Sequence, residues 1–287
     1  AAMVGGGLLA ATRRLGGGLK DRTYAIFGGG SAGTGIYRQL AAAMQREGLT
    51  PAEAAPRIFV VDLPGLLVEG DKALDPRLAT MATKREVVAG WHVRGDRITL
   101  EQVIEHGRPS VLIGVCGKSC QFTEPLIRAM AEYCESPIIM PMSNPTANAE
   151  AIPEDIITWT NGRALVATGS PFGDVVREGR RHRVGQANNV FIFPGVGLGV
   201  IAAKARKVTA GMFGAAAHAL ADMVDDEMLA QGGLYPPITE VREVSRRVAH
   251  AVAVQAVAEE VADPMVDVEA LISQAMWYPS YLPYRPA

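Results

Sequence analysis

The fold is decided by Thr23-Tyr24-Ala25-Ile26-Phe27-Gly28-Gly29-Gly30-Ser31-Ala32-Gly33, which precedes the helically spaced run 34–40. An apolar run, Gly-x-Gly-x-x-Gly and a helical pattern follow one another, as strand, turn and helix do in dinucleotide-binding folds. There, Gly28 would allow the tight turn, Gly30 would let a phosphate approach the backbone, and Gly33 would let helix and strand pack closely. Backbone N–H groups and the helix dipole would meet a pyrophosphate here. We predict that its contacts are Gly28, Gly30, Ser31, Ala32 and Gly33.

A second apolar run, Arg57-Ile58-Phe59-Val60-Val61-Asp62, ends in an acid. In dinucleotide folds, an acid after the second strand accepts hydrogen bonds from the adenosine ribose and repels a 2′-phosphate. The gap from the glycines exceeds the usual spacing of about 20 residues. Thr50-Pro51-Ala52-Glu53 accounts for the excess, because it has the pattern of a capping box with Pro at the first helical position. Alone, Asp62 would be a turn residue, but beside the glycines it is predicted to bind ribose.

Composition excludes several classes of protein. The 287-residue chain has a net charge of −2 and no basic stripe, so we expect no nucleic-acid partner. The longest apolar stretch, 190–203, is interrupted by Pro194 and three glycines, so we expect no membrane span. Cys116, Cys120 and Cys134 are odd in number and are predicted to be reduced thiols. We therefore expect a cytoplasmic protein, with an organelle as the alternative.

Apolar runs and helical patterns alternate along the first two thirds of the chain. Strands are predicted near residues 24–27, 58–62, 110–115, 138–140 and 164–167, with helices between most of them and a polar, irregular stretch to residue 97. This alternation predicts an α/β fold with a Rossmann-type doubly wound parallel sheet flanked by helices. Ligands bind outside the carboxyl ends of such strands, so we predict a site in the loops 28–33, 62–65, 114–117, 143–146 and 168–172.

The pattern changes after residue 188. Residues 189–193 are predicted to form a strand, and Ala-rich helices are predicted near 198–206, 210–223 and 241–261. We therefore divide the chain into an N-terminal helix (1–20), a dinucleotide-binding domain (21–188) and a strand with a helical segment (189–287). The chain opens inside an apolar helical pattern, so we expect it to be a fragment.

Dehydrogenase chemistry needs an acid or base and a group that polarises a carbonyl. The sequence has no His-x-x-x-His and no Asp/Glu cluster with metal-ligand spacing. Asn144 and Asn189 lie at the ends of strand-like runs, and each offers an amide donor and acceptor. Alone, either would be a turn residue. The chain has the features of a cofactor-binding unit that lacks its chemical partner.

Several motifs resemble malic enzyme. They are Phe27-Gly28-Gly29-Gly30-Ser31-Ala32-Gly33-Thr34-Gly35-Ile36, Val61-Asp62-Leu63-Pro64-Gly65-Leu66-Leu67, Ser143-Asn144-Pro145-Thr146, Ala167-Thr168-Gly169-Ser170-Pro171-Phe172, Gly185-Gln186-Ala187-Asn188-Asn189-Val190-Phe191-Ile192-Phe193-Pro194-Gly195 and Leu229-Ala230-Gln231-Gly232-Gly233-Leu234-Tyr235-Pro236-Pro237. They run in order to about residue 262. The chain is thus similar to the C-terminal, cofactor-binding part of that family.

The resemblance implies oxidative decarboxylation of malate to pyruvate and CO₂ with NAD or NADP, and with Mg²⁺ or Mn²⁺ polarising the C2 oxygen. It implies that Val115, Gly117 and Asn144 also contact the cofactor, that Asn144 and Asn189 contact substrate, and that the enzyme is a homo-oligomer. In the family, the Tyr/Lys pair, a substrate-binding Arg and the three metal-ligand carboxylates lie upstream of the position where this chain begins. We assign no catalytic or metal-ligating residue to residues 1–287.

NAD is the expected cofactor, because Asp62 disfavours a 2′-phosphate and the following Leu63-Pro64 supplies no cation. Lys72, Arg77, Lys84 and Arg85 follow in the next loop, so NADP is the alternative. Other possible functions are a non-catalytic, redox-sensing nucleotide module and the cofactor domain of an amino-acid dehydrogenase. A pure sensor has no evident need for Asn144 and Asn189, and the motifs at 143–146 and 188–195 do not suit the amino-acid enzyme.

The missing groups lead to a first prediction. Residues 1–287 alone are expected to show no malate-dependent reduction of NAD or NADP, even with Mn²⁺, because metal ligands and the Tyr/Lys pair are absent. The absorbance of the reduced cofactor measures this directly. Metal-dependent turnover by the purified chain would contradict the prediction.

Overall fold

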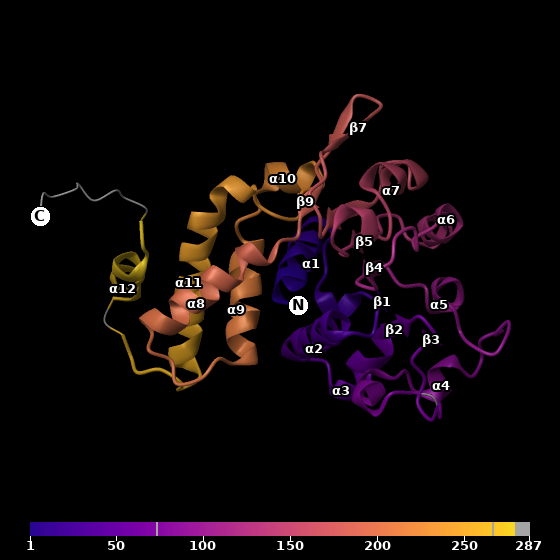
Figure 1. The fold of residues 1–287 in the computed structure, drawn as a ribbon, viewed down its shortest axis with the longest axis horizontal. Helices are drawn as coiled ribbons and strands as arrows, with labels where there is room; N and C mark the ends of the chain where they lie inside the picture. The colour runs from indigo at the N-terminus through magenta and orange to yellow at the C-terminus, as the bar shows by residue number, and fades with distance from the viewer. Residues whose placement is uncertain (73, 266, 279–287) are drawn as a thin grey trace, which may run out of the picture.

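A computed structural model describes residues 1–72, 74–265 and 267–278. Its centre is a seven-stranded sheet in the order β3-β2-β1-β4-β5-β6-β9 (Figure 1). The strands are β1 (Tyr24–Phe27), β2 (Ile58–Asp62), β3 (Gly65–Leu66), β4 (Val111–Gly114), β5 (Ile138–Pro141), β6 (Leu165–Thr168) and β9 (Gly185–Gln186). Every neighbouring pair is parallel except β2 and β3. The predicted α/β class with a doubly wound, mostly parallel sheet is confirmed.

The direction of winding reverses at β1. The chain passes from β1 to β2 on one side and then returns to place β4 on the other side. In doubly wound sheets, ligands bind in the crevice outside the carboxyl ends of the strands where this reversal occurs. The loops that follow β1 and β4 flank that crevice, and the first of them is the glycine turn.

The sheet is buried on both faces because alternate side chains enter two different cores. Tyr24 and Ile26 of β1 pack in one core with α1 (Ala2–Leu15) and α2 (Ser31–Arg46). Ala25 and Phe27 pack in the other core, whose helices are α5 (Leu100–Gly107), α6 (Glu124–Tyr133) and α7 (Pro153–Trp159). Burial on both sides explains why these strands are continuous apolar runs.

Thr50 and Thr99 each begin a helix with a capping box. Thr50 Oγ1 accepts a hydrogen bond from Glu53 N at 3.3 Å at the start of α3 (Pro51–Ala54), so this predicted box is confirmed. Thr99 starts α5 in the same way, with Oγ1 3.4 Å from Gln102 N. The short helix α3 fills the extra length between the glycine turn and β2.

The stretch predicted to be irregular up to residue 97 contains more structure than expected. It holds β3, the 3₁₀ helix η3 (Pro76–Met81) and α4 (Arg85–Val88). A hairpin of β7 (Val175–Arg177) and β8 (Arg180–His182), also unexpected, protrudes from the sheet (Figure 1). Its turn residues Glu178 and Gly179 both have positive φ, 52° and 75°, as a tight two-residue hairpin requires.

The strand predicted over residues 189–193 is wrong. Residues Asn189–Phe191 form the 3₁₀ helix η5, and α8 (Phe193–Ala202) follows directly. Asn188 Oδ1 accepts a hydrogen bond from Val190 N at 3.0 Å, which caps the turn, and Pro194 lies in the first turn of α8, where a missing N–H costs nothing. A short apolar run does not distinguish strand from buried helix by periodicity. The helix predicted at 198–206 accordingly begins earlier.

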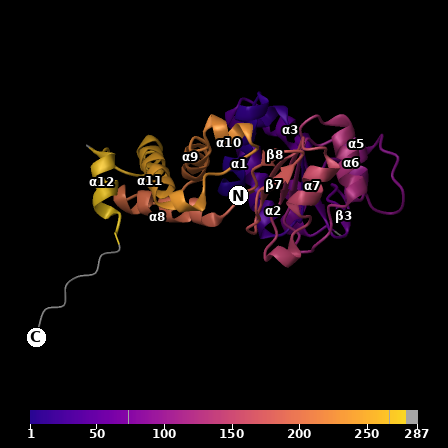
Figure 2. The same ribbon diagram turned by 90° about the horizontal axis from the view of Figure 1, so that it is seen from above.

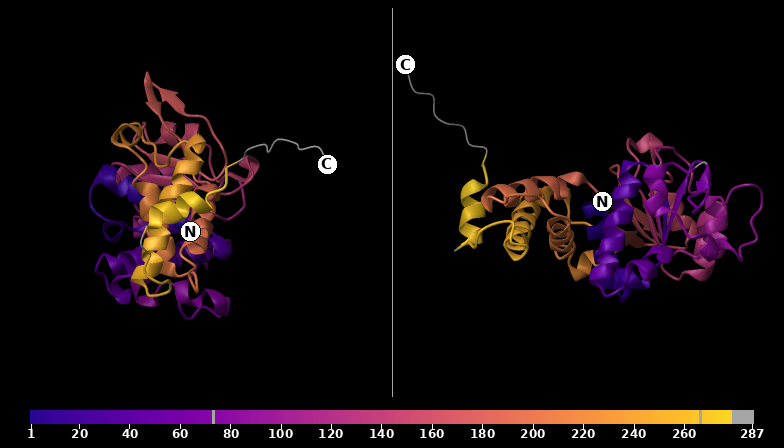
Figure 3. Two further views of the ribbon diagram at one scale, coloured as in Figure 1. Left: turned by 90° about the vertical axis from the view of Figure 1, so that its left-hand side faces the viewer. Right: turned by 90° about the horizontal axis from the view of Figure 1, so that it is seen from below.

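The remaining helices form a bundle beside the sheet. It comprises α8, α9 (Ala210–Ala221), the short α10 (Asp226–Ala230), α11 (Val241–Ala258) and α12 (Val268–Ala275). Figures 1 and 2 show α12, α11 and α9 in a row that ends at α1, and Figure 3 shows this row from two further sides. The Ala-rich helices predicted near 210–223 and 241–261 are confirmed as α9 and α11. Residues 279–287 of the predicted C-terminal segment lie outside the described residues. The other 3₁₀ helices are η1 (Leu19–Asp21), η2 (Ala55–Arg57), η4 (Thr146–Asn148) and η6 (Ile238–Glu240).

Helix α1 joins the sheet to the bundle, because its side chains enter the sheet core and its glycines face α9 and the segment after α10. A Cβ on Gly5 would lie 3.6 Å from Ala217 Cβ, whereas one on Gly7 would lie 2.4 Å from the Tyr235 hydroxyl. That hydroxyl is buried and donates a hydrogen bond to Met3 O at 2.9 Å. The backbone of α1 therefore approaches its neighbours too closely for a side chain at Gly7.

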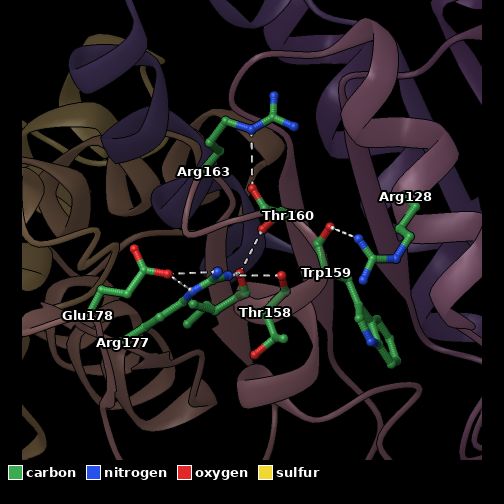
Figure 4. A network of polar contacts seen from close by, with 8 residues as sticks. Arg128, Thr158, Trp159, Thr160, Arg163, Arg177 and Glu178 are labelled. Atoms are coloured by element: carbon green, nitrogen blue, oxygen red, sulfur yellow. Dashed lines mark hydrogen bonds and ion pairs between the residues drawn. The ribbon is translucent and has the colours of Figure 1, made fainter.

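Three arginines from different parts of the chain bind carbonyl groups at the C-terminal end of α7 (Figure 4). Arg128 of α6 donates to Trp159 O at 3.4 Å, Arg163 donates to Thr160 O at 3.2 Å, and Arg177 of β7 donates to Thr158 O at 3.0 Å. Cations are favoured there because the last carbonyls of a helix lack intrahelical partners and carry the negative end of its dipole. These bonds fix the hairpin and α6 to α7.

The α1 contacts predict opposite effects for two like substitutions. Gly5→Ala should raise the free energy of unfolding by about 0.5–1 kcal/mol, because alanine is the better helix former and its Cβ meets only ordinary contacts. Gly7→Ala should lower it by about 1–3 kcal/mol, because the Tyr235 ring must move. Urea unfolding of both variants tests this, and equal shifts would contradict the packing described here.

Candidate functional site

The glycine turn is held against the ends of β2 and β4. Gly28 N donates to Val61 O at 2.8 Å, and Gly28 has a φ of 126°. A Cβ on Gly28 would lie 2.7 Å from Val115 O, and one on Gly33 would lie 1.8 Å from Gly28 O. No side chain fits at either position unless the backbone moves, so these two glycines let the start of α2 lie directly over the sheet.

The start of α2 faces open space. Gly30 is the N-cap of this 16-residue helix, and a Cβ built on it meets no atom within 4 Å. Ser31 and Ala32 are exposed, and the first turn carries no acidic residue. The first N–H groups of a helix have no intrahelical partner and carry the positive end of its dipole. An anion such as a pyrophosphate can therefore bind here.

Two cavities lie on either side of the glycine turn. The acid-side cavity, of about 590 Å³, is lined by Gly29, Gly30, Ser31, Thr34, Gly35, Arg38, Asp62, Asp75, Arg77 and Leu78. The amide-side cavity, of about 290 Å³, is lined by Ala1, Met3, Val4, Ala32, Ile36, Val115, Met142, Asn144, Gly169, Gln186, Ala187, Asn188 and Asn189. A ligand with a phosphate at the start of α2 can extend one half into each.

In the acid-side cavity, Asp62 lies beneath the glycine turn. Its Oδ1 accepts from Leu63 N at 2.9 Å, and its Oδ2 would lie 2.8 Å from a Cβ on Gly29. Arg77 is held by Asp75, with Nε 3.0 Å from Oδ2, and this hydrogen bonding lowers the pKa of Asp75 to about 2. Arg38 of α2 is a cation of this cavity that sequence reasoning missed.

Four cations were considered in the sequence as possible contacts of a 2′-phosphate: Lys72, Arg77, Lys84 and Arg85. Of these, only Arg77 is among the residues that line the acid-side cavity. Lys72 and Arg85 line a different cavity, and Lys84 pairs with Glu86 at 3.6 Å. The helix residue Arg38 and the paired Arg77 are therefore the cations of this cavity.

The amide-side cavity brings together Asn144 and Asn189, which are far apart in the sequence. Asn144 Oδ1 accepts from Ser170 Oγ at 2.6 Å, and its Nδ2 lies 3.0 Å from where a Cβ on Gly169 would be. Asn189 is the first residue of η5 and is exposed, so it does not open a strand as predicted. Both asparagines line the same cavity.

Behind the wall of this cavity lies a buried carboxylate that sequence reasoning missed. Val115 and Gly117 were both predicted to contact the cofactor, and Val115 lines the cavity. The N–H of Gly117 donates to Ser143 Oγ at 2.9 Å, so this N–H is unavailable to a ligand in this arrangement. Ser143 Oγ donates in turn to Glu150 Oε1 at 2.5 Å. Burial raises the pKa of the Cys116 thiol to about 11, so its S–H is retained at neutral pH and lies 3.5 Å from the same oxygen.

Among residues 1–72, 74–265 and 267–278, no group of three or more His, Cys, Asp or Glu side chains is arranged to hold a metal ion. Within the same ranges, no helix combines the length and apolar character needed to cross a membrane.

Comparison with known proteins identifies the family. A family model described as "Malic enzyme, NAD binding domain" matches residues 1–257. The chain belongs to the malic enzyme NAD-binding domain family. An NAD-dependent malic enzyme of Acinetobacter baylyi is 45% identical over 99% of this chain and 51% of its own length, and one of Pseudomonas aeruginosa is 46% identical with the same coverage. The chain thus spans about half the length of the curated relatives it matches.

Solved structures of malic enzymes share the fold. That from Pyrococcus horikoshii Ot3 has a TM-score of 0.72 and 25% identity over 96% of this chain and 57% of its own. That from Entamoeba histolytica has a TM-score of 0.68 and 22% identity, covering 96% of this chain and 52% of its own. The resemblance to malic enzyme inferred from the motifs is confirmed.

We predict that two glycines of the turn, Gly33 and Gly30, differ in their contribution to stability. Gly33→Ala should lower the free energy of unfolding by about 1–3 kcal/mol, because its Cβ would collide with Gly28 O. Gly30→Ala should change it by less than about 1 kcal/mol, because its Cβ meets open space. Thermal unfolding of the two variants measures the difference. Similar losses would show that Gly30 is also held by packing.

Proposed function

We propose that this chain binds NAD as the cofactor-binding half of a malic enzyme, which oxidatively decarboxylates malate to pyruvate and CO₂. The observation that carries the proposal is the glycine turn at the reversal point of a malic-enzyme NAD-binding fold, between two cavities of complementary character. One cavity contains an acid suited to ribose hydroxyls. The other contains two amides suited to a carboxamide and a carboxylate.

Each part of the cofactor has a proposed position. The pyrophosphate would lie at the start of α2, at Gly30, Ser31 and Ala32, and Asp62 would accept from the adenosine ribose. The nicotinamide would enter the amide-side cavity beside Val115 and Asn144. When bound, NAD supplies a hydride acceptor. Asn144 and Asn189 would orient malate with C2 toward the ring, and we propose no acid or base from this chain.

The described residues do not fit a divalent metal. No acidic or histidine cluster surrounds the amide-side cavity, whose polar side chains are Asn144, Gln186, Asn188 and Asn189. We therefore propose that Mg²⁺ or Mn²⁺, expected from the resemblance, is bound by ligands outside this chain, and we derive no step through it.

The other assignments are also proposals. The division of the chain at residues 20 and 188 is supported by the end of the last sheet strand, β9, at Gln186. A cytoplasmic location is proposed from the three cysteines predicted to be reduced thiols, and a homo-oligomer is proposed from the resemblance. The alternative of a redox-sensing module leaves the paired amides without a ligand, which favours the enzyme.

Calorimetric titration of residues 1–287 with NAD and with NADP tests the proposal. NAD should bind more tightly than NADP, and Asp62→Ala should weaken NAD by roughly ten- to hundredfold, because hydrogen bonds to a charged acceptor are lost. Asp75→Ala is the matched control. It removes another acid of the cavity and frees Arg77, so it should leave NAD affinity nearly unchanged and strengthen NADP. Tighter binding of NADP by the unaltered chain, or no binding of either nucleotide, would contradict the proposal.

A further inference from the structure

Glu150 is a fully buried acid whose contacts reach both loops behind the amide-side cavity. Its exposed fraction is 0%. Oε1 accepts from Cys116 N at 3.1 Å and from Ser143 Oγ at 2.5 Å, and Oε2 accepts from Ser143 N at 3.3 Å. Gly114 leaves the space for it, since a Cβ there would lie 2.5 Å from Glu150 Cδ. The acid therefore ties the end of β4 to the end of β5.

The hydrogen-bond partners of Glu150 are uncharged groups. All the donors to Glu150 are backbone amides, a hydroxyl and a thiol, and no ion pair joins it to a cation within the described part of the chain. Donors thus meet both carboxyl oxygens of a fully buried acid, and none of these donors is a cation.

The second observation is the position of Glu150 behind the amide-side cavity. Cys116 and Ser143 directly follow Val115 and Met142, two residues that line the amide-side cavity, and Ser143 directly precedes Asn144. Glu150 is therefore one residue layer behind the wall against which the nicotinamide is proposed to lie. That ring carries a positive charge in NAD⁺ and none in NADH.

We propose that Glu150 is an electrostatic positioning residue that favours the oxidised, cationic form of the cofactor over the reduced, neutral form. The proposal rests on the proposed function, because it requires the nicotinamide in the amide-side cavity. A unit charge one residue layer away, at an effective dielectric constant of about 20, changes the relative affinity for the two forms by on the order of tenfold. A site with this preference loads NAD⁺ and releases NADH.

The test compares NAD⁺ and NADH binding to the whole chain and its variants. Glu150→Gln removes the charge and keeps the shape, so the affinity ratio of NAD⁺ to NADH should fall by on the order of tenfold. The midpoint potential of the bound couple would rise by about 30 mV for each tenfold change. Ser143→Ala is the matched control. It breaks the same network but keeps the charge, so it should weaken both forms alike and leave the ratio unchanged.

The possible results distinguish the inference about Glu150 from the proposed function on which it rests. Equal losses of NAD⁺ and NADH affinity in Glu150→Gln would make Glu150 purely structural and would overturn the inference, while cofactor binding by the unaltered chain would still stand. No binding by the unaltered chain would remove the proposed function itself. If Glu150→Gln does not fold, the affinities of the unaltered chain for NAD⁺ and NADH provide the test. Tighter binding of NADH than of NAD⁺ would overturn the inference.

Discussion

The constraint on which the structure depends is the close approach of α2 to the end of β1. A single added carbon at Gly33 would lie 1.8 Å from Gly28 O, and one at Gly28 would lie 2.7 Å from Val115 O. Because both positions lack side chains, the helix begins directly above the point where the winding of the sheet reverses. Its unpaired N–H groups then face the crevice, with Asp62 on one side and the two asparagines on the other.

Much of the fold could be predicted because its signals are local. Buried parallel strands are continuous apolar runs, and capping boxes at Thr50 and Thr99 mark helix starts by residue type alone. The error at residues 189–193 has a physical cause. Five apolar and amide residues suit either state, and the choice is made by the cap from Asn188 and by packing against the bundle. The two-residue strand β3 is too short to show alternation.

The candidate site could be predicted only in part. The glycine turn, Asp62, Asn144 and Asn189 were found through motifs, and the structure places them around two adjoining cavities. Glu150 has no local signal, since it lies between alanines and its partner Cys116 is 34 residues away. Arg38 resembles any exposed helix cation until α2 is placed beside Asp62. A residue whose role depends on its tertiary neighbours cannot be identified from the sequence alone.

The sheet is bounded on each side by a very short strand. β3 and β9 each contribute two residues, whereas the interior strands have four or five. Long, flat edge strands are templates on which other chains add backbone hydrogen bonds, and short edges are one way in which proteins avoid this. The apolar interior strands, which are rich in Val and Ile, would be prone to aggregate if they were exposed. The two short edges thus shield an aggregation-prone centre from intermolecular pairing.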